Sequence, residues 1–429
     1  MFVRLLALLF VASSLAASEN WPGWRGPRGD GSVADAPDLP VAFDPATDAA
    51  WKTEIPGIGH ASPILWEDRI FLVTAVETER LLLCLDRRGG AILWSRVALT
   101  APPEEIHRLN SHASSTPATD GKRVFVSFLD GSEMFVAAYD FAGEKLWDSR
   151  PGGFSSKHGY CSCPVLWNGK VILNGDHDGD AYLVALDQET GKTIWKTDRP
   201  NKTRSYCTPL LREIGGKMQM ILSGSLSVAA YDPDTGAQIW VMDGPTEQFV
   251  ASLVYHEKAR LLFLTCGFPQ KHILAIRPDG TGKVSKSHIA WRDIEGAAYV
   301  PSPVVSGDCF VLVSDNGVAS CFVATTGERY WRERLPGGHS ASLLAANGLV
   351  YFVSDEGIVS VVKPGKTFSV IAQSPLGEKV SASPAVYDNQ FFFRGEKHLF
   401  CIGPKKAAAT AAAAGADFPS PKTGAGSAD

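Results

Sequence analysis

Apolar residues along the chain gather into short runs, and polar turns rich in glycine, aspartate and asparagine separate these runs. Runs of this kind, bounded by turn signals, indicate β-strands. Segments such as LDGSE, DHDGD, SDNGV and SDEGI are the clearest turns. The pattern therefore predicts a chain built mainly from short strands and tight turns.

One motif recurs along the chain and defines a repeating unit. The segment LDQETGKTIWKT, from Leu186 to Thr197, has four counterparts in which a glycine also stands four residues before a tryptophan; these tryptophans are Trp94, Trp147, Trp240 and Trp331. Such a pattern predicts a hairpin in which glycine supplies a positive φ and the tryptophan packs back on its neighbour. We interpret the tryptophans as structural.

Each unit also begins alike, with a small residue before Pro or Leu and then an apolar strand. The eight starts are at Ser62, Thr116, Cys163, Thr208, Ser252, Ser302, Ser342 and Ser383. Four strand-like runs in a unit of roughly 40–50 residues are typical of a propeller blade. Units five and seven deviate, since the former runs through IRPDGTG to Trp291 and the latter has no tryptophan.

The eighth unit contains three strands, which end in HLFCIG, whereas AAWKTEI near the amino terminus reads as a strand without a blade. Pairing the Trp51 strand with the strand of Phe400 would close the ring and remove an exposed sheet edge. The sequence therefore predicts an all-β fold, an eight-bladed β-propeller of four-stranded antiparallel blades over residues 50–403, closed by the N-terminal strand.

Both ends of the chain differ from the repeats. Residues 1–17 have one early arginine, an apolar stretch and small residues, which is typical of a secretory signal peptide. Residues 18–49 contain WPGWRGPRGDG, which we interpret as a capping segment in which Arg25 or Arg28 stacks on Trp21 or Trp24. Residues 404–429 form a low-complexity stretch rich in alanine and glycine, for which we expect disorder or a short helix.

Charge and cysteine usage narrow the class of protein. The formal net charge of −5 on 429 residues, without a basic run, does not favour nucleic acid as a partner. The apolar stretches are too short for a membrane span. Eight cysteines are present, and we interpret Cys84, Cys321 and Cys401 as small buried residues because other units carry alanine there.

The repeated Asp-Gly-Trp turn resembles that of the pyrroloquinoline-quinone (PQQ) enzyme-like propellers, and NWPGWRGPRGDGS resembles exported propeller proteins of planctomycete-type bacteria. The resemblance covers about Trp21 to Gly403. One branch, the quinoprotein dehydrogenases, implies PQQ held between a tryptophan and a disulfide of adjacent cysteines, with calcium. Here Ser162 separates Cys161 from Cys163. The other branch resembles the non-enzymatic scaffold BamB.

The loops that precede the eight starts converge at one mouth of the predicted channel. They carry polar and aromatic side chains that predict a ligand site, namely His60, His112, His158, Arg204, Tyr206, Tyr299 and His339. Equivalent positions in these loops are also occupied by Lys157, Tyr160, Gln248, Phe249, Glu378 and Lys379. The alternative is that these groups bond to neighbouring carbonyls and join the loops.

Other chemistry finds less support in the sequence. Ser62 beside His60 belongs to the repeat and no G-x-S-x-G segment occurs, so we expect no catalytic serine. Asp176, Asp178 and Asp180 suggest calcium, but a polar hairpin turn is the favoured interpretation. We expect no zinc site, and Glu378 alone does not supply the carboxylate pair of a sugar hydrolase.

From these features we expect an exported, periplasmic or secreted, monomeric propeller. Its function would be binding or scaffolding, without a cofactor, and its partner an envelope protein or a small polar ligand or glycan at the channel mouth. The alternative is a PQQ-dependent dehydrogenase of alcohols or sugars, with PQQ and calcium as its cofactors.

Overall fold

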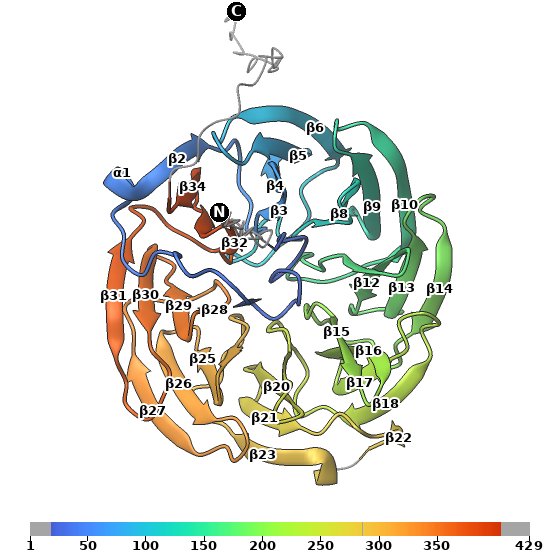
Figure 1. The fold of residues 1–429 in the computed structure, drawn as a ribbon. Helices are drawn as coiled ribbons and strands as arrows, with labels where there is room; N and C mark the ends of the chain where they lie inside the picture. The colour runs from blue at the N-terminus through green and yellow to red at the C-terminus, as the bar shows by residue number, and fades with distance from the viewer. Residues whose placement is uncertain (1–18, 285, 405–429) are drawn as a thin grey trace, which may run out of the picture.

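The computed structural model describes residues 19–284 and 286–404. These residues form eight sheets arranged as a ring around a central channel (Figure 1). The predicted all-β, eight-bladed β-propeller is confirmed. The predicted signal peptide, residues 1–17, and nearly all of the predicted tail lie outside the described residues.

Blades 1 to 4 follow one another in the sequence, and each runs from an innermost to an outermost strand. Blade 1 comprises β3 (Ile64–Trp66), β4 (Arg69–Val76), β5 (Glu79–Asp86) and β6 (Ile92–Thr100). Blade 2 comprises β7 (Ala118–Thr119), β8 (Arg123–Asp130), β9 (Glu133–Asp140) and β10 (Lys145–Gly153). Blade 3 comprises β11 (Val165–Trp167), β12 (Lys170–Gly175), β13 (Tyr182–Asp187) and β14 (Thr193–Asp198). Blade 4 comprises β15 (Leu210–Ile214), β16 (Lys217–Gly224), β17 (Ser227–Tyr231) and β18 (Gln238–Asp243), with β22 (Gly282–Lys283) added in parallel.

Blades 5 to 8 complete the ring. Blade 5 comprises β19 (Val254–His256), β20 (Leu261–Cys266), β21 (His272–Ile276) and β23 (Ile289–Asp293), with the 3-10 helix η1 (Lys286–His288) before β23. Blade 6 comprises β24 (Val304–Ser306), β25 (Cys309–Val313), β26 (Val318–Val323) and β27 (Arg329–Arg334). Blade 7 comprises β28 (Leu344–Ala346), β29 (Leu349–Val353), β30 (Ile358–Val362) and β31 (Val370–Pro375), with β1 (Ser32–Val33) added in parallel. Blade 8 comprises β32 (Ala385–Tyr387), β33 (Gln390–Arg394), β34 (His398–Ile402) and β2 (Ala49–Glu54), which follows the short helix α1 (Pro45–Asp48).

The ring closes as the sequence predicts. Strand β2 pairs antiparallel with β34, and Trp51 lies opposite Cys401 while Lys52 lies opposite Phe400. The Trp51 indole N–H donates to the backbone oxygen of Arg87 in blade 1, at 2.9 Å. One strand from the amino terminus therefore joins the last blade to the first.

A tryptophan of the outermost strand joins six of the eight blades to the next one. Trp147 of blade 2 donates from Nε1 to the backbone oxygen of Gln188 in the turn of blade 3, at 3.0 Å. In that turn Gly191 has φ +70°, and an added Cβ would stand 2.5 Å from the Trp147 ring. The turn therefore needs glycine both for its backbone angle and for the close approach of the indole.

The small residues of the third strands have a cross-strand explanation. Cys84 lies opposite Trp94, Cys321 opposite Trp331 and Cys401 opposite Trp51. Alanine takes the same place opposite the tryptophans of blades 2 to 5. Because the indole on the outer strand is large, only a small side chain fits opposite it on the third strand. The predicted burial of these three cysteines is confirmed.

Residues 19–48 cross the ring on the side of the turns between first and second strands, as the blue segment that leads to β2 in Figure 1 shows. Arg25 donates from Nη2 to the backbone oxygen of Pro303, at 2.5 Å, and Arg212 donates to Asp30, at 2.6 Å. Arg28 bonds to Glu19 and to Ser32. We expected Arg25 or Arg28 to stack on Trp21 or Trp24, but the structure gives both arginines hydrogen bonds to carbonyl, hydroxyl or carboxylate oxygens.

Candidate functional site at the channel mouth

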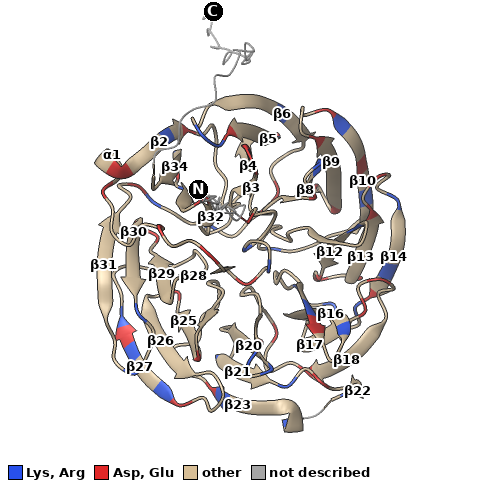
Figure 2. Ribbon diagram, viewed as in Figure 1, with Lys and Arg blue, Asp and Glu red and all other residues tan. Residues whose placement is uncertain are grey.

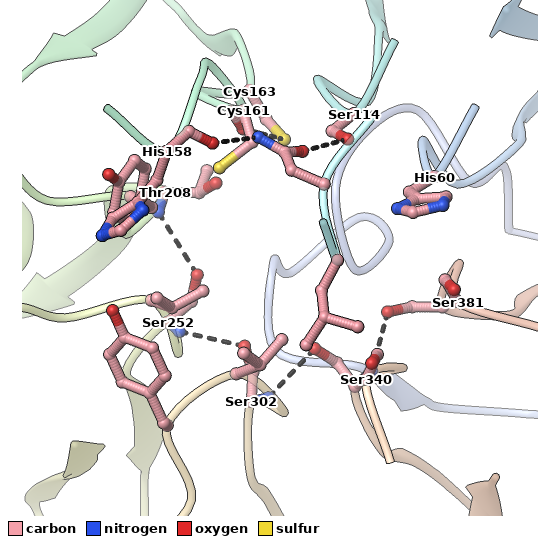
Figure 3. Close-up of a pocket in the computed structure, with 18 of the residues that line it drawn as sticks. His60, Ser114, His158, Cys161, Cys163, Thr208, Ser252, Ser302, Ser340 and Ser381 are labelled. Atoms are coloured by element: carbon pink, nitrogen blue, oxygen red, sulfur yellow. Dashed lines mark hydrogen bonds between the residues drawn. The ribbon is translucent and has the colours of Figure 1, made fainter. Parts of the chain in front are cut away.

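The small residues that begin the innermost strands join neighbouring blades around the channel. The backbone N–H of Ser252 donates to Ser302 Oγ at 2.9 Å, that of Ser302 to Ser342 Oγ at 3.0 Å, and that of Ser342 to Ser383 Oγ at 2.9 Å. The same contact links Ser62 to Thr116 Oγ1, at 3.0 Å, and three of these links are drawn in Figure 3. Ser62, two residues after His60 in the sequence, takes part in this ring through its backbone N–H.

A cavity of about 280 Å³ lies in the channel beside this ring of small residues (Figure 3). Each blade lines the cavity with the residue two positions before its small residue: His60, Ser114, Cys161, Tyr206, Val250, Val300, Ser340 and Ser381. Residues i and i+2 of an extended segment point to the same side, so several of the small residues face the cavity as well. Trp24 of the N-terminal segment lines it too, and its Nε1 donates to Ser252 Oγ at 3.3 Å.

Four of the predicted site residues line this cavity, namely His60, His158, Tyr206 and Tyr299. The rings of His158 and Tyr206 lie 6.3 Å apart, and the Tyr206 hydroxyl is 2.7 Å from Ser156 Oγ. The Tyr299 hydroxyl donates to Gln248 at 2.8 Å. The structure thus brings two phenols and two imidazoles from different blades into one space.

The other three predicted residues are engaged elsewhere. His112 Nε2 lies 2.9 Å from the backbone oxygen of Glu104. Arg204 binds both carboxylate oxygens of Asp178, at 2.7 and 2.8 Å. His339 is 2% exposed, and its backbone N–H donates to the backbone oxygen of Asp315. Contacts of this kind belong to the alternative in which the loops bond to one another.

From the loop between β6 and β7 the sequence predicted His112 and missed the residues that do line the cavity. His107, Leu109 and Asn110 of this loop line the cavity, and Asn110 donates to the backbone oxygen of His158 at 2.7 Å. Leu109 is 52% exposed. The unusual length of the segment from residue 101 to residue 117 was the available signal, because connections between strands are usually shorter.

The groups that face the cavity are mostly neutral. Burial lowers the pKa of His60, and the Arg394 guanidinium lowers it further. Burial also lowers the pKa of His158, with Arg204 acting in the same direction. Asp315 contributes a carboxylate whose two oxygens accept the backbone N–H groups of Tyr299, at 2.8 Å, and Val300, at 3.0 Å. Among the described residues that line the cavity there is no lysine or arginine.

The cysteines at the channel are thiols. Cys161 and Cys163 both line the cavity and are free, as are the other six cysteines. Burial raises the pKa of the Cys161 thiol. The disulfide that the quinoprotein branch implies is therefore not formed between Cys161 and Cys163.

The cavity does not fit PQQ with calcium. PQQ is a planar tricarboxylate, and burying three carboxylates requires cationic partners that these lining residues do not supply. In the described part of the chain, no group of three or more His, Cys, Asp or Glu residues could hold a metal ion. The lining instead presents imidazoles, hydroxyls and aromatic rings, groups that take part in hydrogen bonds and stacking.

The acidic residues named from the sequence have partners of their own. Asp176 pairs with Arg199 at 2.8 Å, Asp180 pairs with Lys202 at 2.6 Å, and all three aspartates lie in the turn between β12 and β13, as the hairpin interpretation expects. Glu378 Oε2 lies 2.6 Å from His398 Nδ1. These contacts use the carboxylates that calcium binding or sugar hydrolysis would need.

The fold and the site define a β-propeller protein with a ligand-sized cavity at one mouth of its channel. Comparison with protein families makes this more specific: the chain belongs to the family described as outer membrane protein assembly factor BamB, whose model matches residues 78–252 and 270–396. The predicted membership of the PQQ-repeat propellers is thereby confirmed.

Individual relatives fall in both branches. The chain is 24% identical over 274 residues to a polyvinylalcohol dehydrogenase of Sphingopyxis sp. strain 113P3, a match that covers 53% of this chain and 40% of that protein. It is 22% identical over 314 residues to BamB of Shewanella oneidensis, covering 66% of this chain and 73% of that protein. The solved structure of BamB from Moraxella catarrhalis superposes with a TM-score of 0.59 at 12% identity, covering 82% of this chain and 99% of that one.

Proposed function

We propose that this protein is a non-enzymatic binding propeller of the cell envelope, and that it binds its partner at the cavity between His60, Tyr206 and Ser381. The observation that carries the proposal is the cavity itself: polar and aromatic side chains from all eight blades converge on a space of about 280 Å³. Ligand sites are commonly concave, with a few convergent polar groups.

The family description and the charge distribution support an interaction role. The matched family model is described as an assembly factor, and it covers more than half of the chain. Basic and acidic residues are interspersed around the ring in Figure 2, which gives no reason to expect nucleic acid as the partner. No helix in residues 19–284 and 286–404 has the length and apolar character that crossing a membrane requires. We further propose that the protein is periplasmic or secreted, and that residues 1–17 are the signal peptide that directs its export.

A variant that fills the cavity tests this function. Ser381→Tyr places a phenol in the space, whereas Ser95→Tyr adds the same group on the exposed outer strand β6. Wild type and both variants are immobilised and exposed to an envelope extract, and retained proteins and glycans are quantified by mass spectrometry. We expect wild type and Ser95→Tyr to retain the same species and Ser381→Tyr to lose them.

Equal retention by all three proteins, with equal thermal unfolding midpoints, would contradict the proposed site. A separate measurement tests the dehydrogenase alternative, which the similarity to a polyvinylalcohol dehydrogenase favours. Purified protein incubated with calcium and PQQ should show neither quinone absorbance nor dye-linked oxidation of alcohols. Appearance of both would replace the binding function with an enzymatic one.

A further inference from the structure

We infer that the channel cavity selects a neutral polyhydroxy ring, the chemistry of a carbohydrate end, and rejects anionic ligands of the same shape. This inference rests on the proposed function, because it names the ligand class of the same cavity. It depends on which hydrogen-bonding groups face the space and on the charges that surround them.

Hydroxyl groups dominate the lining. Seven of its residues are serine and one is threonine. Ser252 Oγ accepts the backbone N–H of Thr208, at 3.3 Å, and the indole N–H of Trp24, also at 3.3 Å. A hydroxyl has two lone pairs, and these two N–H groups use both acceptor positions of Ser252. Sugar hydroxyls both accept and donate hydrogen bonds, and therefore match such a surface.

Aromatic groups supply the surfaces on which a ring can lie. Trp24 closes one side of the cavity, while Tyr206 and Tyr299 stand on blades 4 and 6 facing it. The Tyr206 hydroxyl is held by Ser156 at 2.7 Å, and that of Tyr299 by Gln248 at 2.8 Å. Fixed aromatic rings with polar edges suit a ligand that is apolar on its faces and polar at its rim.

The charges around the cavity oppose an anionic ligand. A carboxylate entering this space would need a cation to replace its hydration, yet the described lining has no lysine or arginine. Arg204, which stands near His158, is already bound by both oxygens of Asp178, at 2.7 and 2.8 Å. Asp315, which lines the cavity, is itself an anion and would repel another.

The polar lining also opposes a fully apolar ligand. Asp315 is the carboxylate that lines the cavity among the described residues, and both of its oxygens accept backbone N–H groups, at 2.8 and 3.0 Å. An apolar ligand would displace water from the lining hydroxyls and imidazoles and would offer them no hydrogen bond in return. A neutral polyol meets each of these conditions.

The test compares sugars of matched ring and length that differ in charge. Tetramers of glucose and galactose form the neutral set, and tetramers of glucuronate and galacturonate form the charged set. Isothermal titration calorimetry measures binding to wild type, Trp24→Phe, Trp24→Ala, Ser381→Tyr and the control Ser95→Tyr. We expect a neutral tetramer to bind wild type and Ser95→Tyr equally, at least 10-fold tighter than its uronate.

Ser381→Tyr should abolish this binding, and Trp24→Ala should weaken it at least 10-fold, with Trp24→Phe in between. Tighter binding of a uronate or of PQQ, lost in Ser381→Tyr, would overturn the inference while supporting the proposed function. Binding of no sugar, with envelope capture still sensitive to Ser381→Tyr, would also overturn the inference alone. Binding of no sugar together with capture that ignores Ser381→Tyr would overturn both.

Discussion

Histidines near the channel are held in an environment that resists protonation, and His339 is the strongest case. Its side chain is 2% exposed, and burial lowers its pKa from 6.5 to about 4, despite the opposing effect of Glu356. In the unfolded chain the imidazole protonates near pH 6.5, whereas in the fold it stays neutral until about pH 4. Its contribution to stability is therefore complete above pH 6.5 and is lost progressively as the pH falls toward 4.

This predicts a pH-dependent loss of stability that is specific to one side chain. Between pH 7 and pH 4 the His339 contribution to the free energy of unfolding should fall by about 2–3 kcal/mol. His339→Gln should remove that part of the slope, as measured by urea unfolding at a series of pH values. Identical slopes for wild type and His339→Gln would contradict the burial argument.

At the residue scale the sequence located the channel mouth but not every side chain that faces it. His60 and Tyr206 stand two positions before a small residue, and this register is the one that lines the cavity in all eight blades. His112 and Arg204 stand four positions before one, and neither lines the cavity. Taking the residue two positions before each small residue would have identified Ser340 and Ser381 as lining residues. Trp24 could not be found, because no repeat relates it to the blades.

The glycine of the tryptophan turn carries two constraints, and its replacement should show both. Gly191→Ala would place a methyl group 2.5 Å from the Trp147 ring at a φ of +70°. We expect a loss of about 2–4 kcal/mol in the free energy of unfolding from backbone strain and overpacking together. Gly169→Ala in the same blade is the control, since φ is +76° but nothing lies within 4 Å of the added carbon.

The control should lose about 1–2 kcal/mol, the cost of the left-handed backbone alone. Chemical denaturation of both variants measures the difference. If Gly191→Ala lost no more than Gly169→Ala, the contact between turn and indole would not contribute to the joining of blades.

The loop from residue 101 to residue 117 depends on a buried ion pair. Arg80 is fully buried, and its Nη2 lies 3.0 Å from Glu104 Oε2. Glu104→Gln removes the carboxylate and leaves the guanidinium without a countercharge, so we expect a loss of about 1–3 kcal/mol. Hydrogen exchange of residues 104–112 should become faster. Glu105→Gln, at the exposed neighbouring position, is the matched control and should change neither quantity.

Elements of regular structure were more predictable than this loop. Turn glycines, apolar runs and the fixed position of the tryptophan recur from unit to unit, so a unit with an unclear pattern can be interpreted from the others. The short parallel strands β1 and β22 and the contacts of the 101–117 loop have no counterpart in other blades. Such contacts depend on segments distant in sequence, which a pattern of apolar positions does not relate.

At the scale of the whole molecule, we propose that residues 18–49 act as a cap on the channel. Arg25 is 2% exposed and bonds to the backbone oxygens of Pro303 and Leu343, while Arg212 pairs with Asp30 at 2.6 Å. Deleting residues 21–31 removes these contacts between blades that are distant in sequence. We expect the thermal unfolding midpoint to fall by several degrees. An unchanged midpoint would leave the cap without a stabilising role.

For the whole molecule, our central proposal is that the closed ring of eight blades creates the binding cavity at its channel mouth. The most direct measurement is a crystal structure of the protein with the ligand that it retains from the envelope extract. The account predicts that this ligand occupies the space between Trp24, Tyr206 and Ser381. A ligand bound on an outer strand or on the face crossed by residues 19–48, with the cavity unchanged, would contradict it.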